Sequence, residues 1–154
     1  MNKKKQPTGV ISNKRARFDF DLKEPLTAGI VLNGPETRSL RSLHGSLQGA
    51  FVQIIRGEAW LMNCLVTPLK TNAAHLPSEM QNRNRKLLLK QRELDDLIEA
   101  KQQGNTIVPL RLLTRGRFIK VEIAVGRGKK QYDKRQTIKK RDENRNTARE
   151  LKNR

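Results

Sequence analysis

The residue types that most often carry enzyme chemistry are few and scattered in this chain of 154 residues. His44 and His75 lie in polar surroundings without a second ligand at metal-site spacing, which is typical of surface histidines. The single cysteine, Cys64, lies in the apolar run WLMNCLV, which favours a buried thiol over a nucleophile. Phosphate-binding glycine loops, nucleophile elbows and paired-carboxylate motifs are absent from the sequence. We therefore expect no enzyme activity, metal, cofactor or small-molecule substrate.

The charge of the chain indicates a different kind of chemistry. Lys and Arg number 33 against 15 Asp and Glu, which makes the formal net charge +18. A field of this strength attracts polyanions such as nucleic acid. No run approaches the roughly 18 apolar residues of a bilayer span, and the basic N-terminus lacks the apolar stretch of a secretory signal. We expect a cytoplasmic protein without a membrane partner.

The positive charge is concentrated at the two ends. Residues 1–17 carry six cations and no acid, residues 127–154 carry twelve cations and four acids, and the middle has a net charge of only +4. Segments so poor in apolar side chains bury too little surface to offset the entropy lost on ordering. The sequence predicts a flexible N-terminal arm over residues 1–12, a folded nucleic-acid-binding domain over 13–126, and a tail over 127–154 that is disordered when free.

Other cations occur in clusters on predicted structural elements. Arg38 and Arg41 share one side of a short helix, where Glu36 either caps the helix or orients one of the arginines. The run from Arg83 to Arg92 crowds five cations at a predicted helix start, where the macrodipole disfavours them, so phosphates would compensate them. Alternatively, their long stems cover the three leucines, and for Lys90 and Arg92 both interpretations stay open. The candidate nucleic-acid-binding residues are Asn13, Lys14, Arg15, Glu36, Arg38, Ser39, Arg41, Arg83, Arg85 and Lys86.

The elements that must hold these clusters are mostly strands. Alternating apolar residues predict a strand over 18–22, and β-branched residues continue it over 26–33. A helix is expected to begin at Gly34-Pro35, a hairpin to turn at Arg56-Gly57, and a second helix to run over 85–103. Two last strands follow, and Pro109 in the first of them suggests a sheet edge or a bulge. About six short strands with two helices predict a mainly β fold, a small antiparallel barrel of the oligonucleotide-binding type.

Three motifs, in order along the chain, resemble one family. They are GPETRSLR from Gly34 to Arg41, RNRKLLL from Arg83 to Leu89, and GKKQYDKR from Gly128 to Arg135. In this order and spacing they are similar to the bacterial tmRNA-binding family, small protein B (SmpB). The resemblance implies an oligonucleotide-binding barrel that binds the tRNA-like domain of tmRNA and delivers it to stalled ribosomes in trans-translation. It also implies that the tail probes the empty mRNA channel beside the decoding centre, against small-subunit rRNA.

The tail supplies the candidate ribosome contacts. As a helix it would place Arg141, Arg145 and Arg149 four residues apart on one face, where the repulsion of each like-charge pair costs about 0.2–0.5 kcal/mol. Binding to phosphates is therefore expected to drive its folding. Tyr132 either stacks on a base or caps the barrel. Gly126 and Gly128 are expected to let the tail move independently. The candidate tail contacts are Lys129, Lys130, Tyr132, Asp133, Lys134, Arg135, Lys139, Arg141, Arg145 and Arg149. A small basic structural ribosomal protein is the alternative function that this composition leaves open.

Overall fold

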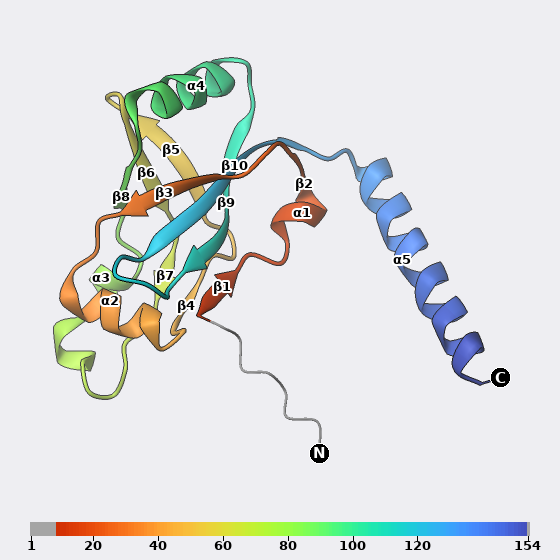
Figure 1. Ribbon diagram of the computed structural model, residues 1–154, viewed down its shortest axis with the longest axis horizontal. Coiled ribbons are helices and arrows are strands. Elements are labelled where there is room, and N and C mark those ends of the chain that lie inside the picture. Colours follow the sequence, from red (N-terminus) through yellow and green to blue (C-terminus); the bar gives the residue numbers. More distant parts are fainter. Residues whose placement is uncertain (1–8, 154) are drawn as a thin grey trace.

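The computed structural model describes residues 9–153 and contains a closed barrel of six antiparallel strands (Figure 1). Around the barrel the strands follow the order β9-β5-β6-β8-β3-β10, and β10 pairs back with β9 to close it. The six strands are β3 (Leu26–Ile30), β5 (Phe51–Ile55), β6 (Glu58–Met62), β8 (Arg85–Leu88), β9 (Thr106–Leu113) and β10 (Lys120–Gly128). The predicted mainly β barrel of about six strands is confirmed.

Shorter elements extend or cover this barrel. Strand β1 (Val10–Ser12) pairs with β9, β2 (Phe20–Leu22) pairs with β10, and β4 (Gly45–Ser46) forms a separate pair with β7 (Leu65–Val66). In Figure 1, α4 lies at one end of the barrel, α2 and α3 lie at the other, and α5 projects away from it. The helices are α1 (Ala16–Asp19), α2 (Gly34–Arg41), the 3-10 turn η1 (Ala73–His75), α3 (Ser78–Gln81), α4 (Gln91–Gln102) and α5 (Gln131–Lys152).

Two apolar clusters hold the fold together. The main one fills the barrel with residues from its strands, together with Leu40 of α2 and Leu97 of α4. A smaller one lies where Ala16 of α1 and Phe20 of β2 pack against the strands β9 and β10. Because α1 has only four residues, this packing, rather than its own hydrogen bonds, is what holds it in place.

Pro109 lies at a β-bulge, as the sequence suggests. Pro109 is paired with Ile123 and Arg111 with Glu122, so Leu110 is the extra residue on β9. Asn13 completes the bulge, since its backbone N–H donates to the Leu110 carbonyl at 2.8 Å and its side-chain amide donates to the Pro109 carbonyl at 3.0 Å. Pro109 therefore interrupts the hydrogen bonding between β9 and β10, and the Asn13 side chain satisfies the carbonyl that the bulge leaves free.

Two predicted elements are wrong in detail. The helix predicted over 85–103 begins only at Gln91, because Arg85–Leu88 is the barrel strand β8, with Leu87 buried and Leu88 exposed. The strand predicted over 18–22 is divided between α1 and β2. In both places a short apolar run fits the spacing of a helix as well as that of a strand, and pairing with strands distant in the sequence decided which one forms. The argument from the helix macrodipole therefore does not apply to Arg83, Arg85 and Lys86.

The predicted boundaries also shift. Residues 10–12 belong to the sheet through β1 rather than to a free arm, while residues 1–8 lie outside the described part. The expected hinge at Gly126 and Gly128 is wrong, because both are paired with β2 and a Cβ at Gly126 would meet Leu22 at 2.9 Å. Where disorder is expected for the free tail, the structure contains the 22-residue helix α5. Disorder of the tail in solution stays a prediction.

Candidate nucleic-acid interface

Helix α2 begins where the sequence predicts, and its first turn contains Glu36. The Glu36 backbone N–H donates to the Asn33 side chain at 2.9 Å, and the Asn33 N–H donates to the Glu36 carboxylate at 3.0 Å. This reciprocal capping box satisfies two of the backbone donors that a helix start leaves free. Pro35 in the first turn adds a preset backbone angle. The carboxylate of Glu36 is thereby fixed inside the protein.

Glu36 is the centre of a buried ion-pair network. Arg83 binds its carboxylate through two hydrogen bonds of 2.7 and 2.6 Å, and Arg85 donates to it from Nε at 3.0 Å. The remaining four N–H donors of Arg85 reach backbone carbonyls at 2.6–3.2 Å, those of Cys64, Met80, Gln81 and Arg83. Arg85 is 0% exposed, so every donor of this guanidinium is satisfied without water.

The surroundings of Glu36 keep it ionised. Burial raises the pKa of this carboxyl group, but the hydrogen bonds from Arg83 and Asn33 and the positive charges of Arg85 and Arg83 outweigh burial. The net pKa of Glu36 is lower than its ordinary value. Burial also raises the pKa of the Cys64 thiol to about 11, which keeps this thiol protonated and unreactive at neutral pH.

The network removes three of the candidate RNA contacts from the surface. Arg85, Glu36 and Ser39 are fully buried, so the structure contradicts a direct RNA contact by any of them. Ser39 instead accepts a hydrogen bond from the buried Asn72 at 3.2 Å, and Asn72 also donates to the Pro35 carbonyl. These residues connect α2 to the segment that leads into β8. Their role is to position the surface around them.

Several other candidates have partners within the protein. Lys86 pairs with Glu58 at 2.6 Å, Asn13 completes the β9 bulge, and Arg15 lies 3.7 Å from Asp19. Arg41 donates three hydrogen bonds to carbonyls of the loop between β9 and β10. Within residues 9–153, Lys14 and Arg38 are exposed and have no ion-pair partner, and Arg83 is 27% exposed beside Glu36. These three remain available to phosphates.

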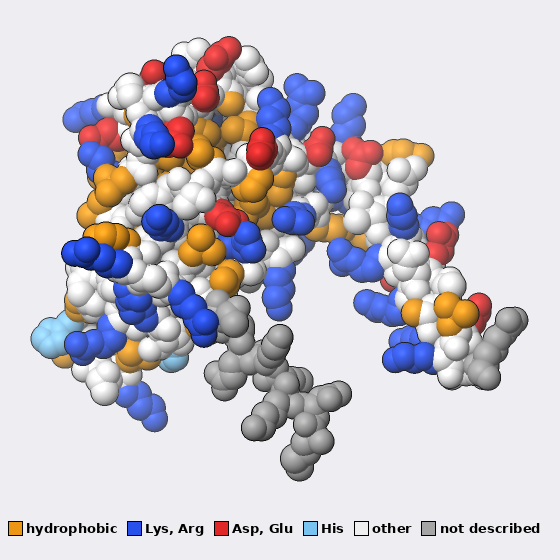
Figure 2. All heavy atoms as spheres, in the orientation of Figure 1, with side chains coloured by type: hydrophobic (Ala, Val, Ile, Leu, Met, Phe, Trp, Pro, Cys, Tyr) orange, Lys and Arg blue, Asp and Glu red, His pale blue; other side chains and the backbone are white. Residues whose placement is uncertain are grey.

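The structure adds surface positions that sequence reasoning missed. A hollow on the barrel is lined by Gly29 of β3, Leu88 of β8 and Lys120 of β10, and Leu88 is 54% exposed beside it. A second exposed apolar side chain, Phe118, lies just before β10. A strand interpretation of Arg85–Leu88 would have shown Leu88 pointing outward, because neighbouring side chains alternate between faces. Figure 2 shows that Lys and Arg side chains are spread over this side of the barrel and along α5.

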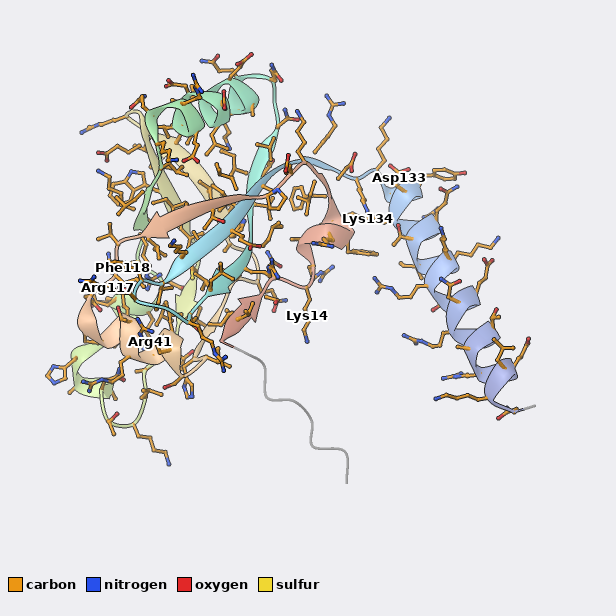
Figure 3. All side chains as sticks on the ribbon, in the orientation of Figure 1. Lys14, Arg41, Arg117, Phe118, Asp133 and Lys134 are labelled. Carbon is orange, nitrogen blue, oxygen red and sulfur yellow. The ribbon has the colours of Figure 1, made fainter. Side chains whose placement is uncertain are left out.

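The first half of the tail contacts α1. The Lys129 backbone N–H donates to the Asp19 carbonyl at 2.9 Å, Lys134 pairs with the Asp19 carboxylate at 3.3 Å, and the Arg141 guanidinium lies 6.0 Å from the Phe18 ring centre. Tyr132 is 68% exposed, which contradicts its alternative interpretation as a cap on the barrel. The other candidates, Lys130, Asp133, Arg135, Lys139, Arg145 and Arg149, are all exposed on α5 or just before it. Figure 3 shows Asp133 and Lys134 at the start of this helix.

Comparison with known proteins decides the family. The family model described as "SmpB protein" matches residues 10–153, nearly the whole chain. The chain belongs to the SmpB family. An SsrA-binding protein of Pseudomonas syringae pv. tomato is 47% identical over 148 residues, which are 95% of this chain and 92% of that protein. An SsrA-binding protein of Streptococcus agalactiae serotype III is 42% identical and covers 97% of this chain and 96% of that protein.

A chain in a solved structure shares the fold. It comes from a study titled "tmRNA-SmpB: a journey to the center of the bacterial ribosome", and it matches with a TM-score of 0.66 and 33% identity over 84% of this chain and 94% of that one. The resemblance to SmpB in three short motifs is thereby confirmed over residues 10–153. Within the SmpB fold, residues 9–153 contain no helix long and apolar enough to cross a membrane.

Proposed function

We propose that this protein binds the tRNA-like domain of tmRNA through its barrel and delivers it to stalled ribosomes in trans-translation. The observation that carries the proposal is the pairing of a rigid barrel, whose buried charges are satisfied internally, with exposed cations that have no such partner. Folded RNA is recognised mainly by shape and phosphates, which a preformed cationic surface suits. Relatives named SsrA-binding proteins and the tmRNA-SmpB study support the choice of RNA.

The tail has a separate role in this proposal. Helix α5 has 22 residues, none of them buried, and at about 1.5 Å per residue it extends about 33 Å. A helix of this length, exposed on all sides and rich in Lys and Arg, suits a channel lined by rRNA phosphates. We assign residues 129–149 to contacts with small-subunit rRNA in the empty mRNA channel near the decoding centre. Tyr132, largely exposed, is placed to stack on a base there.

Binding rather than catalysis is the function we assign to every part of the site. Cys64 is buried with a raised pKa, and the buried carboxylate of Glu36 is held by two arginines. Neither group is free to act on a substrate. Because the proposed function is carried out on ribosomes, we infer a cytoplasmic location.

A small structural ribosomal protein is the alternative, because such proteins also join a β domain to basic arms. The two functions differ in how tightly the protein stays on the ribosome. A structural protein remains on the subunits through a high-salt wash, whereas a tmRNA escort is released. Sequencing the RNA that copurifies with the protein from its own cells separates them further.

The proposal is tested by the salt dependence of RNA binding in two matched variants. Arg38→Ala removes an exposed arginine without an ion-pair partner in residues 9–153, and Arg111→Ala removes one that pairs with Glu122 at 2.7 Å. Losing one phosphate contact lowers the log-log salt slope by about one unit. We expect this change in Arg38→Ala alone, measured by gel shift on the tRNA-like RNA. Equal slopes in wild type and Arg38→Ala would contradict the proposed surface.

A further inference from the structure

The loop between β9 and β10 exposes an aromatic ring on a charged surface. Phe118 is 67% exposed, although the next residue, Ile119, is buried in the main core. The other aromatic residues of the barrel and α1, namely Phe18, Phe20, Phe51 and Trp60, are all at least half-buried. A single exposed apolar side chain is common on protein surfaces, so exposure alone assigns Phe118 no role; the order of the loop and the charge around the ring carry the argument.

The loop that carries Phe118 is held in a defined shape. Arg41 of α2 donates hydrogen bonds to the carbonyls of Thr114, Gly116 and Arg117 at 3.2, 3.0 and 3.1 Å. Hydrogen bonds from a charged donor are stronger than neutral ones. The loop is therefore ordered before any ligand arrives, which reduces the entropy lost on binding. Arg41, a candidate RNA contact from the sequence, thus acts on the loop.

The charge around the ring indicates the class of ligand. Arg115, Arg117 and Lys120 surround Phe118 in the sequence, and no acid occurs between residues 114 and 121. The Arg117 guanidinium lies 5.4 Å from the ring centre, within the range of a cation–π contact. Figure 3 shows Arg41, Arg117 and Phe118 together beside α2, on the opposite side of the barrel from α5. A ring among cations suits a ligand that has both a flat face and negative charge.

We propose that Phe118 is a stacking platform for an unpaired base of the RNA bound by the barrel, with Arg115 and Arg117 contacting the adjoining phosphates. This inference rests on the proposed RNA-binding function and names one contact within it. Bases in a duplex are already stacked, so the ligand is a nucleotide in a loop or bulge of the RNA. The distance of Phe118 from α5 separates this contact from those of the tail (Figure 3).

The test compares variants of the full-length protein on the tRNA-like RNA. Phe118→Ala and Phe118→Leu both remove the aromatic face, and we expect each to weaken binding by about fivefold or more. Their salt slopes should equal that of wild type, because no charge is lost. Arg117→Ala should instead lower the slope by about one unit. Phe118→Trp should bind like wild type, and RNA should quench its fluorescence beyond the change seen with Trp60 alone.

Three outcomes separate this inference from its alternatives. If wild type binds the RNA but Phe118→Ala and Phe118→Leu bind within twofold of it and Phe118→Trp shows no added quenching, the stacking platform is refuted while the proposed function stands. If wild type itself fails to bind, the proposed function fails first. If Phe118→Ala loses only binding to an acidic protein, the platform serves that partner and the inference is overturned. Unchanged thermal unfolding of the variants confirms that the exposed ring does not support the fold.

Discussion

The barrel and the tail use the same side chain in opposite ways. Arg85 in the barrel is buried away from solvent, and protein oxygens accept hydrogen bonds from all five of its N–H donors. Arg145 and Arg149 on α5 are exposed, and within residues 9–153 neither has an ion-pair partner. A buried arginine must be satisfied from within, which makes it a structural residue, whereas an exposed one keeps its donors for phosphates.

This difference teaches how the two regions divide the work. In the barrel, Glu36 uses one carboxylate to hold α2, the segment before β8 and the barrel wall together. The exposed cations around it therefore sit on a frame that does not need to reorganise when RNA binds. The tail has no such centre, because none of the residues in α5 is buried. Whether α5 stays helical therefore depends on its surroundings, such as phosphates that bind its cations.

The sharpest test of this division removes the tail. A protein ending at Lys130 keeps β10, its pairing with β2 and the Lys129 contact to Asp19, so we expect near-wild-type affinity for the tRNA-like RNA. Peptide tagging on ribosomes stalled at a message end should be abolished, because α5 can no longer reach the mRNA channel. A protein ending at Lys152 is the matched control. Normal tagging without residues 131–154 would refute the role of the tail, and loss of RNA binding would place the tail in the recognition surface.

The next largest effect concerns the buried network. Glu36→Gln leaves Arg83 and Arg85 without their counter-charge, and breaking a buried pair in this way lowers the free energy of unfolding by about 3–5 kcal/mol. Glu58→Gln breaks the exposed pair with Lys86 and should cost less than about 1 kcal/mol. Urea unfolding followed by Trp60 fluorescence measures both. Similar losses in the two variants would show that burial does not set the value of the Glu36 pair.

The same network predicts an acid dependence of stability. Because the folded-state pKa of Glu36 is lowered, the unfolded chain takes up the proton more readily, and the stability from its charge is lost as pH falls below about 4.3. Above that pH the contribution is fully present. The difference in urea midpoint between wild type and Glu36→Gln should therefore shrink from pH 6 to pH 3. A difference that is constant over this range would contradict the ionised state of Glu36.

The smallest expected effect is at the joint between the two regions. Asp19→Asn removes the 3.3 Å pair with Lys134 and the 3.7 Å contact with Arg15. Both are partly exposed, so we expect the free energy that holds the tail to α1 to fall by less than about 1 kcal/mol. We expect faster amide hydrogen exchange in the first turns of α5 with no change in barrel unfolding. Asp142→Asn, an exposed acid further along α5, provides the control. Equal exchange in both variants would mean that α1 does not hold the tail.

Much of the fold follows from local sequence signals. The start of α2 at Gly34-Pro35, the hairpin at Arg56-Gly57 and the bulge at Pro109 depend on a few neighbouring residues and are found where predicted. The run RKLLL is the main failure, because three leucines and flanking cations suit a helix as well as a strand. Pairing of β8 with β3 and β6, which are distant in sequence, decided in favour of the strand.

The sequence by itself determined the type of the protein: its strong positive charge, the excess of cations at both ends, the number of barrel strands and the family. Tertiary structure alone decided which cations are available. Arg85, Arg41 and Lys86 look alike in the sequence, yet one is buried against Glu36, one holds the β9–β10 loop, and one pairs with Glu58. Residue type sets the charge of a side chain, but the partners that distinguish these three residues, namely Glu36, the β9–β10 loop and Glu58, lie 28 to 76 positions away in the chain. For this reason, only the folded chain separates the residues that bind RNA from those that support the surface.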